Sequence, residues 1–335
     1  MEKPITAPLP EVSELIKKSW SFYKQNYKKF LLLSVPLVCL AVVGSIIGLL
    51  LQMSNLPNSV GYILVMVGIL LSLAVPIFSI VFPIVLIKNI KDAEENSLFD
   101  AITLYKSSFK ILLPLVWVGI LFTLISLGGS ILFLIPGIAL AGYLGYYHYT
   151  VVLDGKRGLE ALLASFYYVR GNWWGIFGRL FLLGLVVGGV ALILLLIMVV
   201  AFMLLKGGFS VENLRTLIVI SEAPGGITSG LLNIITAILQ YSILYPIFTL
   251  FSYFIFKELK TSKTLPDEQG QKKARSWLKA FAILGAFVIP LILASIVLVS
   301  LQDARTRAAS ATQRQMMMEN GLEDRLGETQ EPSGL

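Results

Sequence analysis

Seven long apolar segments constrain this chain more than any other feature of its sequence. A helix that crosses the hydrocarbon core of a bilayer needs about 20 mostly apolar residues. Each of the seven segments approaches or exceeds that length, and none contains Asp or Glu. Only 14% of the whole chain is charged, whereas about 25% is usual in soluble domains. The segments are Phe30–Leu51, Val60–Ile87, Ile111–Leu127, Ile131–Leu153, Trp174–Leu205, Ile227–Phe256 and Leu278–Leu301.

These segments predict an all-α, polytopic transmembrane bundle of about seven spans. The third and fourth are joined only by Gly128, Gly129 and Ser130, so we expect a tight hairpin there. One broken, re-entrant helix is the alternative. The predicted parts are a six-helix membrane domain at 1–257, a charged cytoplasmic linker at 258–276, a seventh transmembrane helix at 277–302 and an extracytoplasmic helical or disordered tail at 303–335.

The distribution of Lys and Arg predicts the orientation. Six lie before the first span, four in 88–110, three in 154–173 and seven in 257–279. The loop at 52–59 and the turn at 128–130 have none, and 206–226 has two. Segments rich in basic residues stay in the cytoplasm, so we expect a cytoplasmic N-terminus and an external C-terminus in a bacterial cytoplasmic membrane. The first 29 residues are polar and charged, which argues against a cleavable secretory signal.

Amphipathic stretches precede the first, third and fifth spans. Leu15 and Tyr23 share one helical face of the first, Ile102 lies on the second, and Leu162 and Leu163 lie on the third. We expect these faces to sink to the acyl boundary at the cytoplasmic surface. Each stretch with its hairpin then forms one unit. A true internal repeat and a set of ordinary amphipathic entries to the membrane both fit the pattern.

Several short runs resemble known families. Leu-Ile-Pro-Gly-Ile at 134–138 and Val-Arg-Gly-Asn-Trp-Trp at 169–174 are similar to a poorly characterised group of bacterial six-helix membrane domains. One such domain is joined to glycerophosphodiester phosphodiesterases. That resemblance implies a six-helix fold over about 10–257 and no known catalytic residues; no phosphodiesterase domain accompanies it. The run 294–301 resembles the stem helix of type IV pilin-like proteins, without their processing motif.

A small set of polar and aromatic residues lies in or beside the predicted spans. His148 sits among tyrosines, where it suits a proton relay, a headgroup ligand or an ordinary aromatic belt. Arg179 suits a lipid phosphate, a helix carbonyl or snorkelling toward the headgroups. Asn233 and Gln240 are seven apart and share a helical face, which suits a polar path or interhelical hydrogen bonds. The candidate lipid or polar contacts are His148, Arg170, Trp173, Trp174, Arg179, Asn233 and Gln240.

The sequence argues against enzymatic chemistry. It has one histidine and one cysteine, too few for a metal centre or a cysteine-rich framework. We find no catalytic set, no metal ligands and no cofactor-binding motif, and basic residues flank the spans instead of forming a nucleic-acid groove. We therefore expect a non-enzymatic, lipid-associated or envelope-assembly module whose partners are membrane lipids, other envelope proteins or itself, and not nucleic acid. A transporter or channel for a small or amphiphilic solute is one alternative, and a scaffold for a pilus-like or secretion assembly is another.

Overall fold

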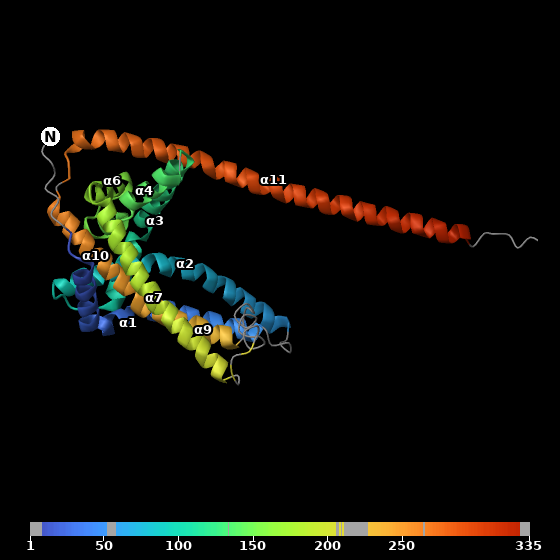
Figure 1. Ribbon diagram of the computed structural model, residues 1–335, viewed down its shortest axis with the longest axis horizontal. Coiled ribbons are helices and arrows are strands. Elements are labelled where there is room, and N and C mark those ends of the chain that lie inside the picture. The colour runs from blue at the N-terminus through green and yellow to red at the C-terminus, as the bar shows by residue number, and fades with distance from the viewer. Residues whose placement is uncertain are drawn as a thin grey trace, which may run out of the picture.

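The computed structural model describes residues 9–51, 58–132, 134–205, 208, 210, 227–263 and 265–328. In this part every regular element is a helix (Figure 1). Five helices are long and apolar enough to cross a membrane, which confirms the expected helical class and agrees with a membrane protein. They are Val12–Leu51, Asn58–Glu94, Ala101–Ile131, Trp173–Ile193 and Asn233–Ser262.

Four helices extend toward the same end of the molecule (Figure 1). They are α1 (Val12–Leu51), α2 (Asn58–Glu94), α7 (Trp173–Leu205) and α9 (Ile227–Leu239). A short π-helix, η1 (Gln240–Leu244), joins α9 directly to α10 (Tyr245–Ser262). The sixth predicted span is therefore one continuous helical path with a π segment inside it.

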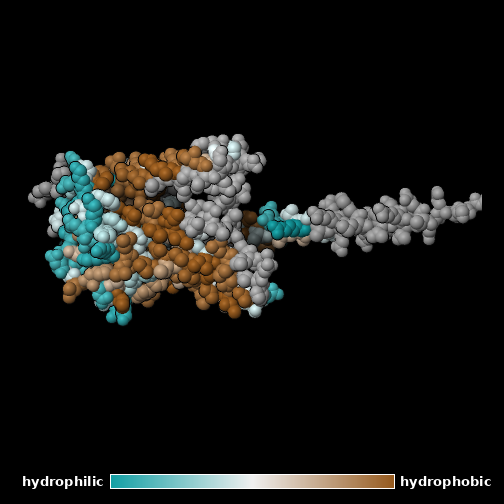
Figure 2. All heavy atoms as spheres, turned by 90° about the horizontal axis from the view of Figure 1, so that it is seen from below, coloured by the Kyte–Doolittle hydropathy of each residue, from teal (hydrophilic) through white to brown (hydrophobic). Residues whose placement is uncertain are grey.

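Hydrophobic residues form a broad band across the visible face of the bundle, and hydrophilic residues gather at one end of it (Figure 2). Leu70, Leu113 and Leu291 are 63%, 78% and 68% exposed. Such a continuous apolar surface is far larger than soluble monomers tolerate. It is the surface that lipid tails cover on a helix bundle whose backbone groups are satisfied internally.

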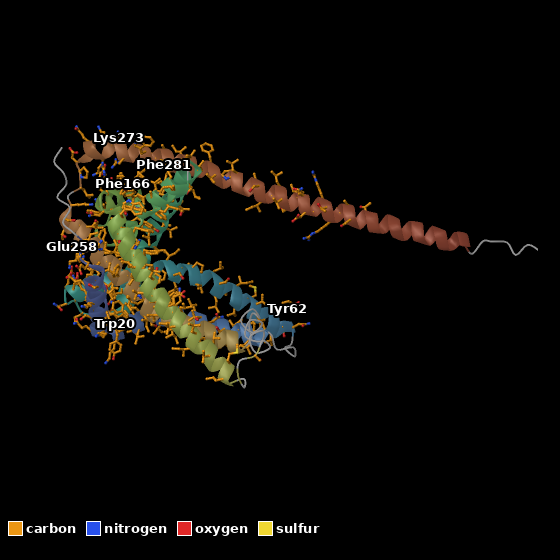
Figure 3. All side chains as sticks on the ribbon, in the orientation of Figure 1. Trp20, Tyr62, Phe166, Glu258, Lys273 and Phe281 are labelled. Atoms are coloured by element: carbon orange, nitrogen blue, oxygen red, sulfur yellow. The ribbon has the colours of Figure 1, made fainter. Side chains whose placement is uncertain are left out.

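The hydrophilic end, called the polar end below, brings together the four segments in which basic residues are frequent. These are the segment before the first predicted span, 88–110, 154–173 and 257–279. Figure 3 shows Trp20 of α1 and Glu258 of α10 at this end, and Tyr62 of α2 at the opposite end. The predicted loops at 52–59 and 206–226 lie mostly outside the described residues. Three lysines in or just after α10 contact the other segments: Lys257 pairs with Glu94, Lys260 pairs with Asp154, and Lys263 donates to the carbonyls of Tyr168 and Arg170.

The chain reverses direction between α3 (Ala101–Leu132) and α4 (Leu134–Leu144). The reversal lies after Leu132, not at 128–130 as predicted, because the glycines extend α3 instead of ending it. They let the two helices approach closely. A Cβ built on Gly137 would lie 1.9 Å from Ser130 Oγ, and one on Gly129 would lie 3.2 Å from the Gly137 Cα. The expected tight reversal is present, displaced by a few residues.

The fourth predicted span is divided. A turn at Gly145 and Tyr146 separates α4 from the short helix α5 (Tyr147–Leu153). Neither piece is long enough to cross a bilayer alone, and neither is among the five candidate spanning helices. The break leaves a space between α4, α5 and α7.

The amphipathic stretches pack differently from what we predicted. The first two are continuous with the spans that follow them, and only the third is a separate helix, α6 (Gly158–Val169). Leu15 and Tyr23 are 2% and 7% exposed, and Leu162 and Leu163 are fully buried against other helices. The prediction that these two faces contact lipid is wrong, because neighbouring helices cover them. In the second stretch Ile102 is 66% exposed, as predicted for a residue outside the protein core.

The predicted seventh span lies inside α11 (Glu268–Glu328), a helix of 61 residues that runs along the bundle and far beyond it (Figure 1). At 1.5 Å per residue it is about 90 Å long. It packs against α3 with almost no separation: a Cβ on Gly128 would lie 2.0 Å from the Phe281 carbonyl oxygen, and one on Gly285 would lie 1.9 Å from the Leu124 carbonyl oxygen. Among its described residues, the segment predicted as a linker at 258–276 is helical except at 263 and 265–267.

Candidate functional site

The break between α4 and α5 forms one wall of a pocket of about 370 Å³. The other walls come from the end of α6, the first three turns of α7 and the middle of α10. Most of the lining is aromatic or aliphatic. The lining residues are Ile138, Ala141, Gly142, Gly145, Tyr146, His148, Tyr149, Val169, Trp173, Ile176, Phe177, Leu180, Phe248 and Ser252.

Ser165 of α6 holds the helix break open. A turn inside an apolar bundle leaves backbone groups without their helical partners, and each such group must be satisfied locally. The Ser165 hydroxyl accepts a hydrogen bond from the Tyr146 N–H at 3.1 Å and donates one to the Tyr143 carbonyl at 3.0 Å. Thr150 Oγ1 makes a similar link to the Ala161 carbonyl at 2.9 Å. The pocket therefore depends on Ser165 and Ala161 of α6, which do not line it themselves.

The Trp173 indole packs directly against α4, because the facing residue of α4 is Gly142, which has no side chain. A Cβ on Gly142 would lie 2.2 Å from the Trp173 indole nitrogen. The indole stacks on Phe177 at a centroid distance of 5.3 Å, with the two rings parallel within 1°. Trp174 meets Trp173 edge to face but is itself 77% exposed and faces away from the pocket. Of the two predicted tryptophans, only Trp173 lines the site.

The polar groups of the pocket are few and uncharged. Among the described residues, no Lys, Arg, Asp or Glu lines it. Tyr149 donates from its hydroxyl to the Thr249 carbonyl at 3.0 Å. Tyr146 is 5% exposed, yet its buried hydroxyl has no hydrogen-bond partner within the described part of the chain. The predicted candidate His148 lines the pocket with its ring 4.4 Å from that of Tyr149.

Arg179 lies outside the pocket and has a structural role. Its guanidinium donates to three backbone carbonyls: from Nε to Pro10 at 2.8 Å, and from the two terminal nitrogens to Leu9 at 2.7 Å and Gly175 at 2.9 Å. Of the roles considered for Arg179, contact with a helix carbonyl is the one that the structure contains. The guanidinium ties the chain before α1 to α7. Arg170, by contrast, contributes its backbone carbonyl to Lys263 at the polar end.

Asn233 and Gln240 are not brought together in one pocket. Asn233 lines a separate pocket of about 380 Å³ between α1, α2 and α9, which Gly44, Gly48 and Gly230 widen. Gln240 begins the π-helix η1 and is not part of that lining. The face predicted from their spacing therefore does not form a common polar path through the described residues.

The π-helix in the sixth span did not emerge from the sequence pattern. Tyr23 of α1 donates from its hydroxyl to the Ser242 carbonyl at 2.8 Å, and the hydroxyls of Ser34 and Ser242 lie 2.7 Å apart. A π segment disturbs the regular i→i+4 ladder, and these side chains satisfy groups within it. They also link α1 to η1.

Of the residues that line the pocket, sequence reasoning singled out only His148 and Trp173 and missed the others, among them Tyr146, Phe177 and Ser252. A partial signal existed, because Gly145 follows an apolar run and is followed by four aromatic residues. The position of Ser165 opposite this run depends on the tertiary packing. No local pattern indicated it.

The described residues contain no group of three or more His, Cys, Asp or Glu side chains placed to hold a metal ion. No family model, no curated protein and no solved structure matches this chain, so the comparisons with known proteins place it in no family.

Proposed function

We propose that this chain is a multi-pass protein of a bacterial cytoplasmic membrane with seven spans, a cytoplasmic N-terminus and an external C-terminus. The gathering of the basic segments at one end of the helical bundle supports this orientation, because basic segments are retained in the cytoplasm. Contacts between Lys257 and Glu94, and between Lys260 and Asp154, join three of these segments. In this proposal α4 and α5 together form the fourth span, and α11 supplies the seventh.

We further propose that the protein is a non-enzymatic module that associates with lipid. The pocket at the helix break carries this proposal. It is apolar and aromatic, it contains no charged side chain among the described residues, and Trp173 places it near the polar end of the bundle. Pockets with these properties bind ligands mainly by burying apolar surface, and a few polar groups fix the orientation. The resemblance to six-helix membrane domains stays a prediction that agrees with such a role.

Native mass spectrometry of the full chain, extracted gently from its membrane, tests this function. We expect a reproducible lipid adduct on the protein, and loss of most of that adduct in Ala141→Phe, because the larger side chain fills the pocket. Gly188→Phe is a matched control, since a Cβ at Gly188 has no neighbour within 4 Å. A bare wild-type protein under the same conditions would contradict lipid association and would direct attention to protein partners.

The transporter alternative rests on the second pocket, where Asn233 supplies an amide among small residues. The separation of Asn233 from Gln240 weakens it. A scaffold role rests on α11, whose exposed continuation past Leu301 offers a surface for other envelope proteins. Solute flux in liposomes checks the first alternative. Loss of a co-purifying partner on deletion of 303–335 checks the second.

A further inference from the structure

We propose that the pocket at the α4–α5 break binds the uncharged, oxygen-bearing part of a lipid, with the Tyr146 hydroxyl as its hydrogen-bond donor. This inference rests on the proposed lipid association and names the chemistry of the ligand. The ligand class is an apolar chain or ring that carries a carbonyl, ester or hydroxyl oxygen. It includes uncharged lipids such as diacylglycerols and prenylated quinones, and also the ester region of a phospholipid.

The lack of charged side chains among the described lining residues points to an uncharged ligand group. Burying an ionised group without a partner in an apolar site is very costly. No Lys, Arg, Asp or Glu lines the pocket among the described residues. Arg179 is the cation nearest in sequence to the pocket residues of α7, and its guanidinium already donates to three carbonyls. A phosphate would therefore have no counter-charge inside the pocket, so a charged headgroup stays outside.

Tyr146 indicates where the ligand oxygen lies. Three other buried or half-buried tyrosines of the bundle each donate to a backbone carbonyl of another helix. Tyr146 is as buried as these, but its hydroxyl has no partner in the described part of the chain. A buried hydroxyl without a partner is unfavourable, and Tyr146 is one of the residues that line the pocket. The three paired hydroxyls are Tyr23 to Ser242, Tyr105 to Leu33 and Tyr149 to Thr249.

The rim of the pocket indicates how the ligand enters. Ile138, Phe177 and Phe248 line the pocket and are 52%, 46% and 48% exposed on the apolar belt. A lipid chain therefore reaches the Trp173–Phe177 stack from the bilayer without crossing water. The oxygen-bearing part then meets Tyr146 at the helix break.

The decisive comparison uses two tyrosine-to-phenylalanine variants of the full chain. In Tyr146→Phe the lost hydroxyl has no hydrogen-bond partner among the described residues, so we expect an unchanged or higher melting temperature without ligand. In Tyr105→Phe the bond to the Leu33 carbonyl is lost outside the pocket, so we expect a lower melting temperature and unchanged binding. Binding is measured by native mass spectrometry with three probes: dioleoylglycerol, a short-chain prenylated benzoquinone and dioleoylphosphatidylglycerol.

We expect at least one probe to bind the wild-type protein and to bind Tyr146→Phe about tenfold more weakly, the loss of one hydrogen bond. If only the uncharged probes show this loss, the ligand is an uncharged lipid. If phosphatidylglycerol shows it too, the ester region of a phospholipid occupies the pocket.

Equal binding of every probe to wild type and Tyr146→Phe would overturn the pocket assignment and leave lipid association standing. Absence of binding by all three probes and of any co-purified lipid would overturn both. A melting temperature of Tyr146→Phe that falls as far as that of Tyr105→Phe would also overturn the assignment, because the hydroxyl would then have a structural partner.

Discussion

Asp154 is an acidic side chain that is only 7% exposed, at the end of α5. Its carboxylate accepts from Lys260 of α10 and from the Tyr168 hydroxyl of α6. Burial and the neighbouring carboxylate raise the pKa of Tyr168 to about 12, so this hydroxyl stays a donor at any physiological pH. Three helices thus meet at one buried carboxylate, which stabilises the polar end only while its partners are present.

Removing the Lys260 ammonium tests this arrangement. We expect Lys260→Met to lower the free energy of unfolding by about 1–3 kcal/mol, because a largely buried carboxylate loses its charged partner. Lys91→Met is the control. Lys91 pairs with Glu95 at 3.8 Å, and both side chains are about half exposed, so its loss costs less than about 0.5 kcal/mol. Chemical denaturation in detergent micelles compares the two, and equal costs would refute the special role of Asp154.

Asp100 gives a residue-scale prediction for pH. Hydrogen bonds from the Thr103 hydroxyl and the Ile102 N–H to its carboxylate, at the start of α3, hold the pKa of Asp100 below its ordinary value. Its contribution to stability is therefore complete above the ordinary pKa of about 3.9 and is lost as the pH falls through the lowered value. We expect wild type to melt at a higher temperature than Asp100→Asn at pH 7, and the difference to shrink and vanish as the pH falls through the lowered pKa of Asp100. A difference that persists in acid would rule out titration of this group.

At the scale of single elements, glycine decides how α11 meets the bundle. The Gly128–Gly285 crossing leaves no room for a Cβ on either helix. Leu278 of α11 is 3% exposed and packs in the same cluster as Leu162 and Leu163 of α6. Tyr167 of α6 donates to the Gly270 carbonyl at 3.1 Å. The start of α11 is therefore integrated with α3 and α6 instead of standing apart from them.

Substitution at this crossing provides the element-scale test. We expect Gly285→Leu to cost about 1–3 kcal/mol of stability, because the backbones must separate. We also expect faster trypsin cleavage at Arg275, whose contact with Glu160 at 3.8 Å loosens with α11. Gly188→Leu is the control, since a Cβ at Gly188 meets no neighbour. Equal stability and equal cleavage in the two variants would show that close packing at Gly285 does not hold α11.

At the scale of the whole molecule, the sequence predicted what depends on local hydrophobicity. The apolar runs at 30–51 and 60–87 lie within α1 and α2, and the basic segments lie together at one end of the bundle. Two features escaped prediction because they depend on distant partners. The break at Gly145 is stable only because Ser165 satisfies the freed backbone groups. Leu15 is buried because other helices pack against this face of α1. An amphipathic pattern alone cannot distinguish a face that contacts protein from one that contacts lipid.

The candidate site was predicted only in part, because some of its features also depend on distant partners. His148 and Trp173 were identified because histidine and tryptophan stand out beside an apolar span, and both line the pocket. Arg179 was identified on the same ground, but its guanidinium binds backbone carbonyls. Tyr146 was not singled out. Its significance lies in the missing partner of its hydroxyl, and only the packed structure reveals that.

The orientation of the whole molecule is the claim on which the rest depends, and cysteine labelling tests it most directly. The only native cysteine, Cys39, is replaced by Ala, and single cysteines are introduced at Ser97 near the polar end and at Ala308 on α11; both positions are exposed. Seven spans with a cytoplasmic N-terminus predict that a membrane-impermeant maleimide labels Ala308→Cys in intact spheroplasts. Ser97→Cys should react only after permeabilisation. Labelling of both cysteines only after permeabilisation would place the tail in the cytoplasm and contradict the seventh span, and labelling of Ser97→Cys in intact cells would reverse the orientation.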